Sequence, residues 1–167
     1  NQINYDDKFI FDDLAYNFLP SEISAAFALV QLEKLDKNIK KRSGNYFYLK
    51  NILSDSENFH VPTSYSNVET GWLAFPFILK NKLASKRKEM QMILEKSGIQ
   101  TRTIFTGNIM KQPVAKKFKW ESFGTFNVSN EVMKSGILIG CHNSLSKDDL
   151  EYMGQKLLEA ERILSNC

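Results

Sequence analysis

The sequence has little of what marks several large classes of protein. Its two cysteines, Cys141 and Cys167, lie far apart, which indicates a reducing compartment rather than a disulfide framework. No apolar run approaches the length needed to cross a membrane, and no signal peptide opens the chain. We therefore expect a cytoplasmic protein that has no membrane partner. The first residue is Asn1 rather than methionine, which suggests a processed, truncated or excised piece.

Side chains for catalysis are equally scarce. Of the two histidines, His60 lies among polar residues of an expected loop, where we expect it to be exposed. Cys141 and His142 are neighbours at the end of an expected strand, so they point to opposite faces and a Cys–His dyad is not expected. A metal site needs more ligands than these. The chain also has no glycine-rich phosphate loop and no serine nucleophile elbow, so on its own it assembles no active site.

The charge is mild, with a net value of +3 at pH 7. Basic residues cluster in segments 37–42, 86–88 and 116–119, each beside apolar residues at helical spacing, which is typical of a solvated helix face. No Arg/Gly-rich tract or zinc-knuckle spacing is present. We therefore expect no nucleic-acid partner.

What the chain does have is enough apolar material for one domain with a sizeable core, with 43% hydrophobic residues in 167. Residues 1–14 show no helical period and are expected to be an extended lead-in. Ser21 is the expected N-cap of a helix that runs to about Lys41, and a second helical run, Asn45–Leu53, follows near Gly44. Helices of this combined length often bridge two domains or line a subunit interface. The alternative is an ordinary amphipathic core helix.

The middle of the chain reads as loop, strand and helix. Residues 54–70 are rich in turn-forming types and predict a loop. Residues 71–80 predict a buried strand, in which Pro76 indicates an edge position or a bulge. Ser85 is the expected cap of a helix over residues 86–96, with Gly98 as its stop.

The stretch from Ile99 to Pro113 holds the most suggestive pattern. It begins as a β-branched strand and breaks at Gly107-Asn108, a pair suited to a sharp turn. Arg102 and Lys111 lie on either side, so the turn could present backbone donors and two cations to an anion. The alternative is a strand, a turn and two solvated basic residues, and physical chemistry alone favours this alternative.

The remaining residues complete an α+β pattern. A helical turn is expected over residues 116–120, a short helix over 130–135 ended by Gly136, and a buried strand over 137–141. Ser146 and Asp149 fit the capping box of a last helix. The order of elements predicts a small, mostly antiparallel sheet covered by helices on one face.

Several segments, in order, resemble one family. Asp6-Asp-Lys-Phe-Ile-Phe and the run from Ala15-Tyr-Asn to Gln31-Leu-Glu-Lys-Leu35 are similar to the Gly-Tyr-Asn-x-Arg…Ala-Ala…Gln-Leu-x-x-Leu signature of the DegT/DnrJ/StrS sugar aminotransferases. Trp72-Leu-Ala-Phe-Pro, Thr101-Arg and Ile139-Gly-Cys-His-Asn-Ser-Leu resemble later landmarks. Gly107-Asn-Ile-Met-Lys-Gln-Pro113 resembles the branch of nucleotide-sugar 3-dehydrases, such as CDP-4-keto-6-deoxyglucose 3-dehydrase.

The resemblance implies the C-terminal portion of a fold-type I enzyme that uses pyridoxal phosphate (PLP) or pyridoxamine phosphate (PMP). Residues 1–20 would be a segment of the large cofactor domain, and residues 21–167 the inter-domain helix and small domain. The cofactor-anchoring Lys, or the His that replaces it in the 3-dehydrases, would lie upstream of this chain. The enzyme would be a homodimer with its active site at the subunit interface, and this chain alone would be inactive.

The same resemblance assigns site residues. Asn17 matches the family's Asn that reaches the cofactor phosphate of the partner subunit, and Tyr16 accompanies it. The substrate-facing residues would be Arg102, Asn108, Lys111 and His142, with Arg102 suited to bidentate recognition of a diphosphate. The family's Gly before Tyr is Ala15 here, and its basic residue two positions after Asn is Leu19, which removes a cation. For each candidate the alternative is a surface or capping residue.

Two enzymatic functions follow from the resemblance, and a third possibility stays open. The first is C3 dehydration of a nucleotide-linked 4-keto-6-deoxy sugar for surface-polysaccharide (lipopolysaccharide) synthesis. The second is amino transfer to such a keto sugar. The third is a non-catalytic interaction module.

Overall fold

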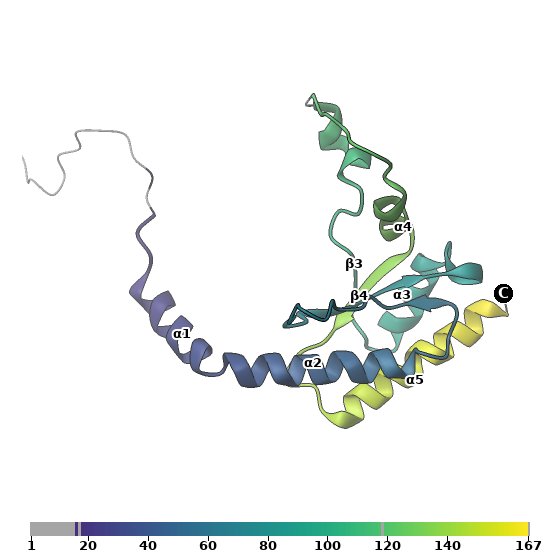
Figure 1. The fold of residues 1–167 in the computed structure, drawn as a ribbon. Coiled ribbons are helices and arrows are strands. Elements are labelled where there is room, and N and C mark those ends of the chain that lie inside the picture. Colours follow the sequence, from purple (N-terminus) through teal and green to yellow (C-terminus); the bar gives the residue numbers. More distant parts are fainter. Residues whose placement is uncertain (1–15, 17, 118, 167) are drawn as a thin grey trace, which may run out of the picture. The chain divides into compact units, whose positions relative to one another are not determined.

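The computed structural model describes residue 16, residues 18–117 and residues 119–166 (Figure 1). The expected lead-in over residues 1–14 and the candidate Asn17 lie outside the described residues. The chain divides into two units, one up to Leu35 and one from Asp36 onward, and each is described by itself.

The first unit contains helix α1 (Glu22–Glu33), which follows Ser21 as predicted, although the Ser21 side chain makes no capping hydrogen bond. The expected run to about Lys41 is wrong. The helix closes at Lys34, whose amide donates to the Gln31 carbonyl at 3.2 Å in a tightened last turn. No residue of α1 is buried. Its exposed apolar side chains are Ile23, Phe27, Leu29, Val30 and Leu32.

The second unit opens with helix α2 (Leu35–Ile52), which runs without a break through Gly44. The expected interruption near Gly44 is therefore wrong. A glycine in a helix interior costs about 1 kcal/mol relative to alanine, whereas burial of one leucine side chain contributes about 1.5–3 kcal/mol. Tyr46 and Leu49, just beyond Gly44, are fully buried, and Tyr46 stacks on Trp72 with 3.5 Å between ring centroids. Tertiary burial thus holds the helix together.

One antiparallel sheet forms the centre of this unit, with strand order β1-β2-β4-β3. The strands are β1 (Phe59–His60), β2 (Ala74–Leu79), β3 (Thr101–Thr103) and β4 (Gly136–Gly140). Strand β1 lies within residues 54–70, where the sequence predicts only loop, because two residues are too few to show a strand pattern. His60, in β1, is exposed as expected.

Strand β2 shows how the sheet separates its faces. Phe75, Phe77 and Leu79 are fully buried, while Ala74, Pro76 and Ile78 alternate with them and are half-buried. β1 pairs with β2 only at Ile78 and Leu79. Pro76 therefore has a strand partner, β4, on one side only, which suits a residue without an amide hydrogen.

Helix α3 (Arg87–Lys96) follows the short 3-10 helix η2 (Asn81–Leu83) and ends as the sequence predicts. Gly98 has φ +75°, its amide donates to the Glu95 carbonyl at 3.0 Å, and the Ile99 amide donates to the Leu94 carbonyl at 2.9 Å. This is a Schellman motif, which needs a left-handed residue. The predicted cap at Ser85 is wrong, since the N-cap is Lys86 and has no side-chain bond.

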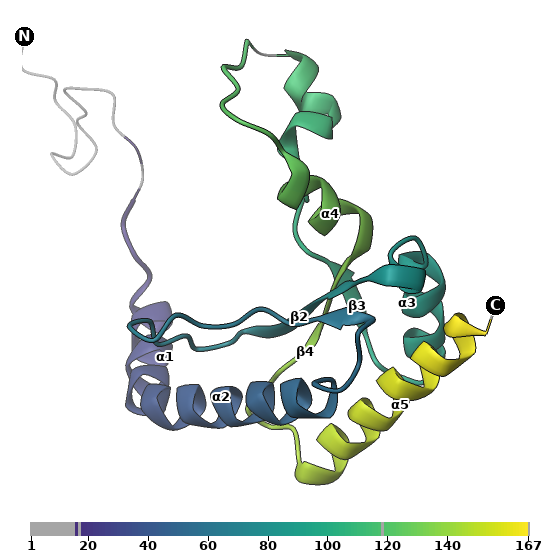
Figure 2. The same ribbon diagram turned by 45° about the vertical axis from the view of Figure 1, so that its right-hand side comes forward.

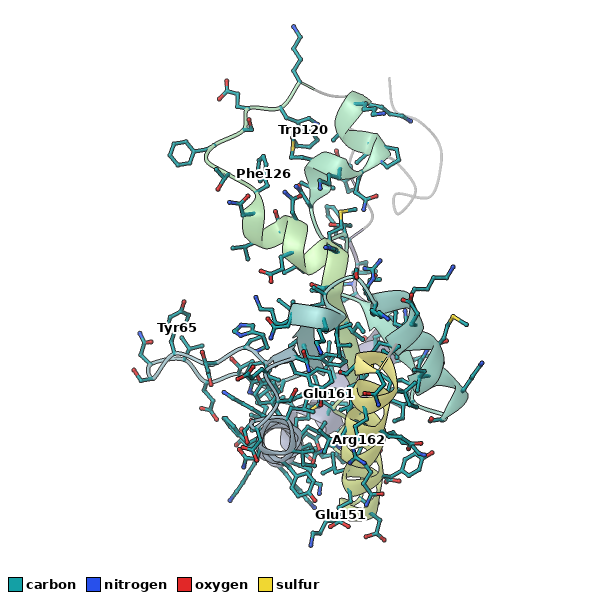
Figure 3. The ribbon with its side chains drawn as sticks, turned by 90° about the vertical axis from the view of Figure 1, so that its right-hand side faces the viewer. Tyr65, Trp120, Phe126, Glu151, Glu161 and Arg162 are labelled. Carbon is teal, nitrogen blue, oxygen red and sulfur yellow. The ribbon has the colours of Figure 1, made fainter. Side chains whose placement is uncertain are left out.

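Residues 104–135 form a lobe that leaves the sheet between β3 and β4 (Figure 1). It contains 3-10 helices η3 (Ile109–Lys111) and η4 (Pro113–Lys117) and helix α4 (Asn127–Ser135). Instead of the expected turn over residues 116–120, the chain turns at η4, and the Trp120 indole donates to the Ala115 carbonyl at 2.8 Å. Trp120 and Phe126 both lie in the stretch that joins η4 to α4 (Figure 3).

The last helix, α5 (Lys147–Ser165), begins with the predicted capping box: the Ser146 side chain accepts from the Asp149 amide, and the Asp149 side chain accepts from the Ser146 amide. Helices α2 and α5 lie on one side of the sheet (Figure 2). Their buried residues and those of α3 join the inward residues of β2 and β4 in one core. The α+β architecture, with a small antiparallel sheet covered on one face, is confirmed.

Candidate functional site

The turn after β3 is built around Gly107. Its φ is +63°, and a Cβ there would lie 2.4 Å from Cβ and 2.7 Å from Cα of Met133 in α4. Only glycine meets both demands, the left-handed backbone and the close approach of α4. The sharp turn predicted at Gly107-Asn108 is therefore present.

Asn108 fastens the same turn to the lobe. It is 4% exposed, its Oδ1 accepts from the Met110 amide at 2.9 Å, and its Nδ2 donates to Oδ1 of Asn130 at 2.8 Å. Gln112 adds a bond from its Nε2 to the Thr106 carbonyl at 3.0 Å. The Asn108 carboxamide is thus used to cap η3 and to join it to α4.

The two cations of this stretch remain available. Arg102, in β3, is exposed and lies opposite Leu138 of β4, and Lys111, in η3, is exposed. Within the described part of the chain neither forms an ion pair. Both can therefore meet an anion without first giving up a protein partner.

Arg102 also lines a cavity of about 490 Å³ at the end of the sheet, a volume within the range of small-molecule sites. Its walls are largely apolar and include Ile99 just before β3, Leu138 of β4 and Met153 of α5. Two polar groups of α5 also line it. Hydrogen bonds from the Ser146 hydroxyl and amide lower the pKa of Asp149, and the Tyr152 hydroxyl donates to the Ser97 carbonyl at 2.9 Å.

His142 lies in the loop after β4, exposed to solvent. Its Nδ1 accepts from the Ser144 amide at 3.2 Å, so in the neutral ring Nε2 carries the proton. Its carbonyl accepts from Nδ2 of Asn45 at 2.7 Å, which ties the loop to α2. The ring can therefore donate one hydrogen bond from Nε2.

Cys141 faces the opposite way. It is fully buried, its thiol lies 3.4 Å from the Arg42 carbonyl, and burial raises the pKa of the thiol to about 11 against an opposing effect of the Arg42 charge. A thiol with this pKa is protonated at neutral pH and is no nucleophile. The expectation that Cys141 and His142 form no dyad is confirmed.

The structure does not bring the four substrate candidates together. Asn108 is bonded to α4, which precedes β4, whereas His142 follows β4. β4 has five residues, which corresponds to about 17 Å of strand. Arg102 lies between them, opposite Leu138. The described candidates therefore lie at separate places along the sheet and do not form a single active site by themselves.

The remaining candidates add little geometry. Tyr16 is 85% exposed and stacks on Phe18, with 5.2 Å between ring centroids. Asn17 lies outside the described residues. Across the described ranges, no three His, Cys, Asp or Glu side chains could hold a metal ion, and no helix is long and apolar enough to cross a membrane.

Sequence reasoning missed three residues of interest. Asp149 and Tyr152 line the cavity with Arg102, but their positions in α5 show only a cap and a helical period. The strand expected from Ile99 onward includes Phe105, but Phe105 lies in a turn. The signal that could have revealed it is the Thr106-Gly107 pair that follows, which is compatible with an early end of the strand.

Comparison with known proteins agrees with these landmarks. Residues 2–158 match the model of the DegT/DnrJ/EryC1/StrS aminotransferase family. The lipopolysaccharide biosynthesis protein RfbH of Salmonella typhimurium is 30% identical over 156 residues, which cover 93% of this chain and 36% of that protein. GDP-4-keto-6-deoxy-D-mannose 3-dehydratase of Escherichia coli O55:H7 is 29% identical over 92% of this chain and 39% of that protein.

The fold is that of a solved relative. The structure of E. coli GDP-4-keto-6-deoxy-D-mannose-3-dehydratase with bound hydrated PLP superimposes with a TM-score of 0.79 and 30% identity, over 90% of this chain and 39% of that one. The chain thus spans a little under two fifths of the length of these relatives. With the family model covering residues 2–158, this chain belongs to the DegT/DnrJ/EryC1/StrS aminotransferase family.

Proposed function

We propose that this chain is part of a longer PLP- or PMP-dependent enzyme that removes the C3 hydroxyl of a nucleotide-linked 4-keto-6-deoxy sugar. The observation that carries the proposal is the similarity, at 29–30% identity over more than nine tenths of the chain, to a 3-dehydratase and to a lipopolysaccharide biosynthesis protein. The product would enter surface-polysaccharide synthesis. The reaction would take place in the cytoplasm, where nucleotide sugars are the usual activated donors.

The domain assignment stays part of this proposal. Residues 1–20 would be a segment of the large cofactor domain, and residues 21–167 the inter-domain helix and small domain. The apolar side chains that α1 exposes support an arrangement in which further protein covers this helix, because surfaces of this kind are rare on free soluble domains. We propose that the cover comes from the large domain and from the partner in a homodimer.

The described residues do not assemble a cofactor site by themselves. Tyr16 is exposed, and Asn17 lies outside the described residues. We propose that the anchoring Lys or His lies in the large domain, and that Asn17 donates to the cofactor phosphate of the partner subunit. A bound cofactor of this kind supplies an electron sink.

The role of this chain in the enzyme would be to bind the nucleotide sugar. Arg102 and Lys111 are exposed, and neither has an ion-pair partner among the described residues, so both could pair with the diphosphate. His142 could donate from Nε2 to a sugar or phosphate oxygen. Asn108, whose carboxamide is engaged by Met110 and Asn130, would act by holding the turn in place.

A second candidate is amino transfer to the keto sugar, and the family's own description as aminotransferases favours it. The two reactions require different residues at one position outside this chain. A Lys there forms a covalent Schiff base with PLP, and a His cannot. The identity of that residue therefore separates the two proposals.

Borohydride trapping tests this difference on the full-length protein. We expect PLP to bind, with its own absorbance, but to leave no covalent pyridoxyl adduct in the intact mass after borohydride treatment, because no Lys anchors it. A known PLP-dependent aminotransferase, treated in parallel, controls for the reduction. A permanent adduct on this protein would instead make amino transfer the better assignment.

A further inference from the structure

Phe105 combines an exposed side chain with a backbone conformation that costs free energy. It is 90% exposed and has φ +43°. It lies in a turn closed by the Gly107 amide, which donates to the Ile104 carbonyl at 3.1 Å. A positive φ at the second residue alone is the pattern of a type II′ turn, which normally takes glycine there. A large aromatic residue in this place is therefore unexpected.

The two other non-glycine residues of positive φ in the described part of the chain have visible compensation. Trp72 stacks on Tyr46 at 3.5 Å between ring centroids, with an interplanar angle of 8°. Asn81, a residue type that tolerates this conformation, donates from its side chain to the Glu57 carbonyl at 2.8 Å. The ring of Phe105 gains no comparable burial. Among the described residues, neither burial nor ring stacking offsets the backbone cost at Phe105.

The turn that carries Phe105 is fixed by its neighbours. Thr103 Oγ1 donates to the Phe105 carbonyl at 3.4 Å, and Gln112 Nε2 donates to the Thr106 carbonyl at 3.0 Å. Gly107 lies so close to Met133 that the turn cannot shift toward α4. A side chain on such a support is pre-organised for contact, because little freedom remains to be lost on binding.

The charges around this turn indicate what the ring contacts. Arg102 precedes Phe105 by three residues, at most about 10 Å of extended chain, and Lys111 follows in η3. Both are exposed. Bases stack on aromatic rings, and phosphates pair with Arg and Lys, so an exposed ring that lies within six residues of two available cations along the chain fits a nucleoside diphosphate.

We propose that Phe105 is the surface on which the base of the nucleotide sugar stacks, while Arg102 and Lys111 face its diphosphate. This assignment rests on the proposed function for the identity of the ligand. It makes Phe105 a binding residue for the base of the nucleotide, with no part in the bond-breaking chemistry.

Phe105→Gly and Phe105→Trp in the full-length enzyme test this proposal. Glycine removes the ring and suits the positive φ, so we expect KM for the nucleotide sugar to rise roughly 10-fold, from the loss of one stacked base, with kcat unchanged. We expect the thermal midpoint to stay the same or rise, because no buried contact is lost. Tryptophan keeps a stacking ring and should hold KM within about 2-fold.

Inhibition by GDP and by inorganic pyrophosphate supplies a readout that a structural role would not move. In Phe105→Gly, the inhibition constant of GDP should rise by the same factor as KM. The inhibition constant of pyrophosphate, which has no base, should equal that of the wild type. Equal inhibition by GDP in the wild type and in Phe105→Gly would overturn the proposal. So would a lower thermal midpoint together with a loss of kcat, since that would place the ring against another part of the protein.

The two proposals fail in different ways. If the wild type does not convert a nucleotide-linked keto sugar, the proposed function fails. GDP binding, measured by equilibrium dialysis, then still tests whether Phe105 stacks on the base. Weaker GDP binding by Phe105→Gly would support the stacking role, and equal binding would overturn it.

Discussion

Replacing Phe77 with alanine is expected to lower the free energy of unfolding by about 3–5 kcal/mol. Phe77 lies in β2 opposite Ile137 of β4 and is fully buried. Its ring meets Phe59 edge-on, with 5.5 Å between centroids. Removing it takes packing from the centre of the core, and the loss is a large part of the 5–15 kcal/mol that typically holds a domain together.

Phe123→Ala is the matched control, because Phe123 is 100% exposed. We expect it to change the unfolding free energy by no more than about 0.5 kcal/mol. Chemical denaturation followed by far-UV circular dichroism measures both variants on one scale. Similar small losses for the two variants would contradict the placement of Phe77 in the core.

Gly107→Ala carries the second large effect, an expected loss of about 2–5 kcal/mol. Two costs combine in this estimate. A left-handed backbone costs an L-residue about 1–2 kcal/mol, and forcing an added methyl group against packed atoms costs about 1–3 kcal/mol more. The second cost arises because the new Cβ would lie 2.7 Å from Cα of Met133, a backbone atom that cannot rotate away.

Gly124→Ala separates the two costs. Gly124 has φ +71°, but no atom of the described residues lies within 4 Å of the position its Cβ would take. We expect only the backbone cost there, about 1–2 kcal/mol. Denaturation of the two variants in parallel gives the difference, which measures the contact between the Gly107 turn and α4. Equal losses would show that this contact is absent.

The local signals in the sequence predict much of the fold. The Ser146 capping box, the Gly98 stop and the strand expected within residues 71–80 each reflect a rule that acts within a few residues, and each is confirmed. The errors occur where distant contacts decide the outcome. Gly44 is a local helix breaker, yet α2 continues because Tyr46 and Leu49 are buried against the sheet.

The candidate site shows the same division. Composition and spacing identify Arg102 and Lys111 as cations beside a turn, and both are exposed in the structure. Sequence cannot show that the Asn108 carboxamide is bonded to Asn130, 22 residues away. Nor can it show the left-handed backbone of Phe105, because that conformation is imposed by the turn around it and not by the residue type.

The structure of the product tests the central claim most directly. The full-length protein would be incubated with PLP, an amino-acid amino donor and a nucleotide-linked 4-keto-6-deoxy sugar labelled with ¹³C, and the product would be examined by NMR. C3 dehydration predicts that the hydroxyl-bearing carbon at C3 loses its oxygen, with no nitrogen bonded to C4. A product that keeps the C3 hydroxyl and carries an amino group at C4 would contradict the account and establish amino transfer.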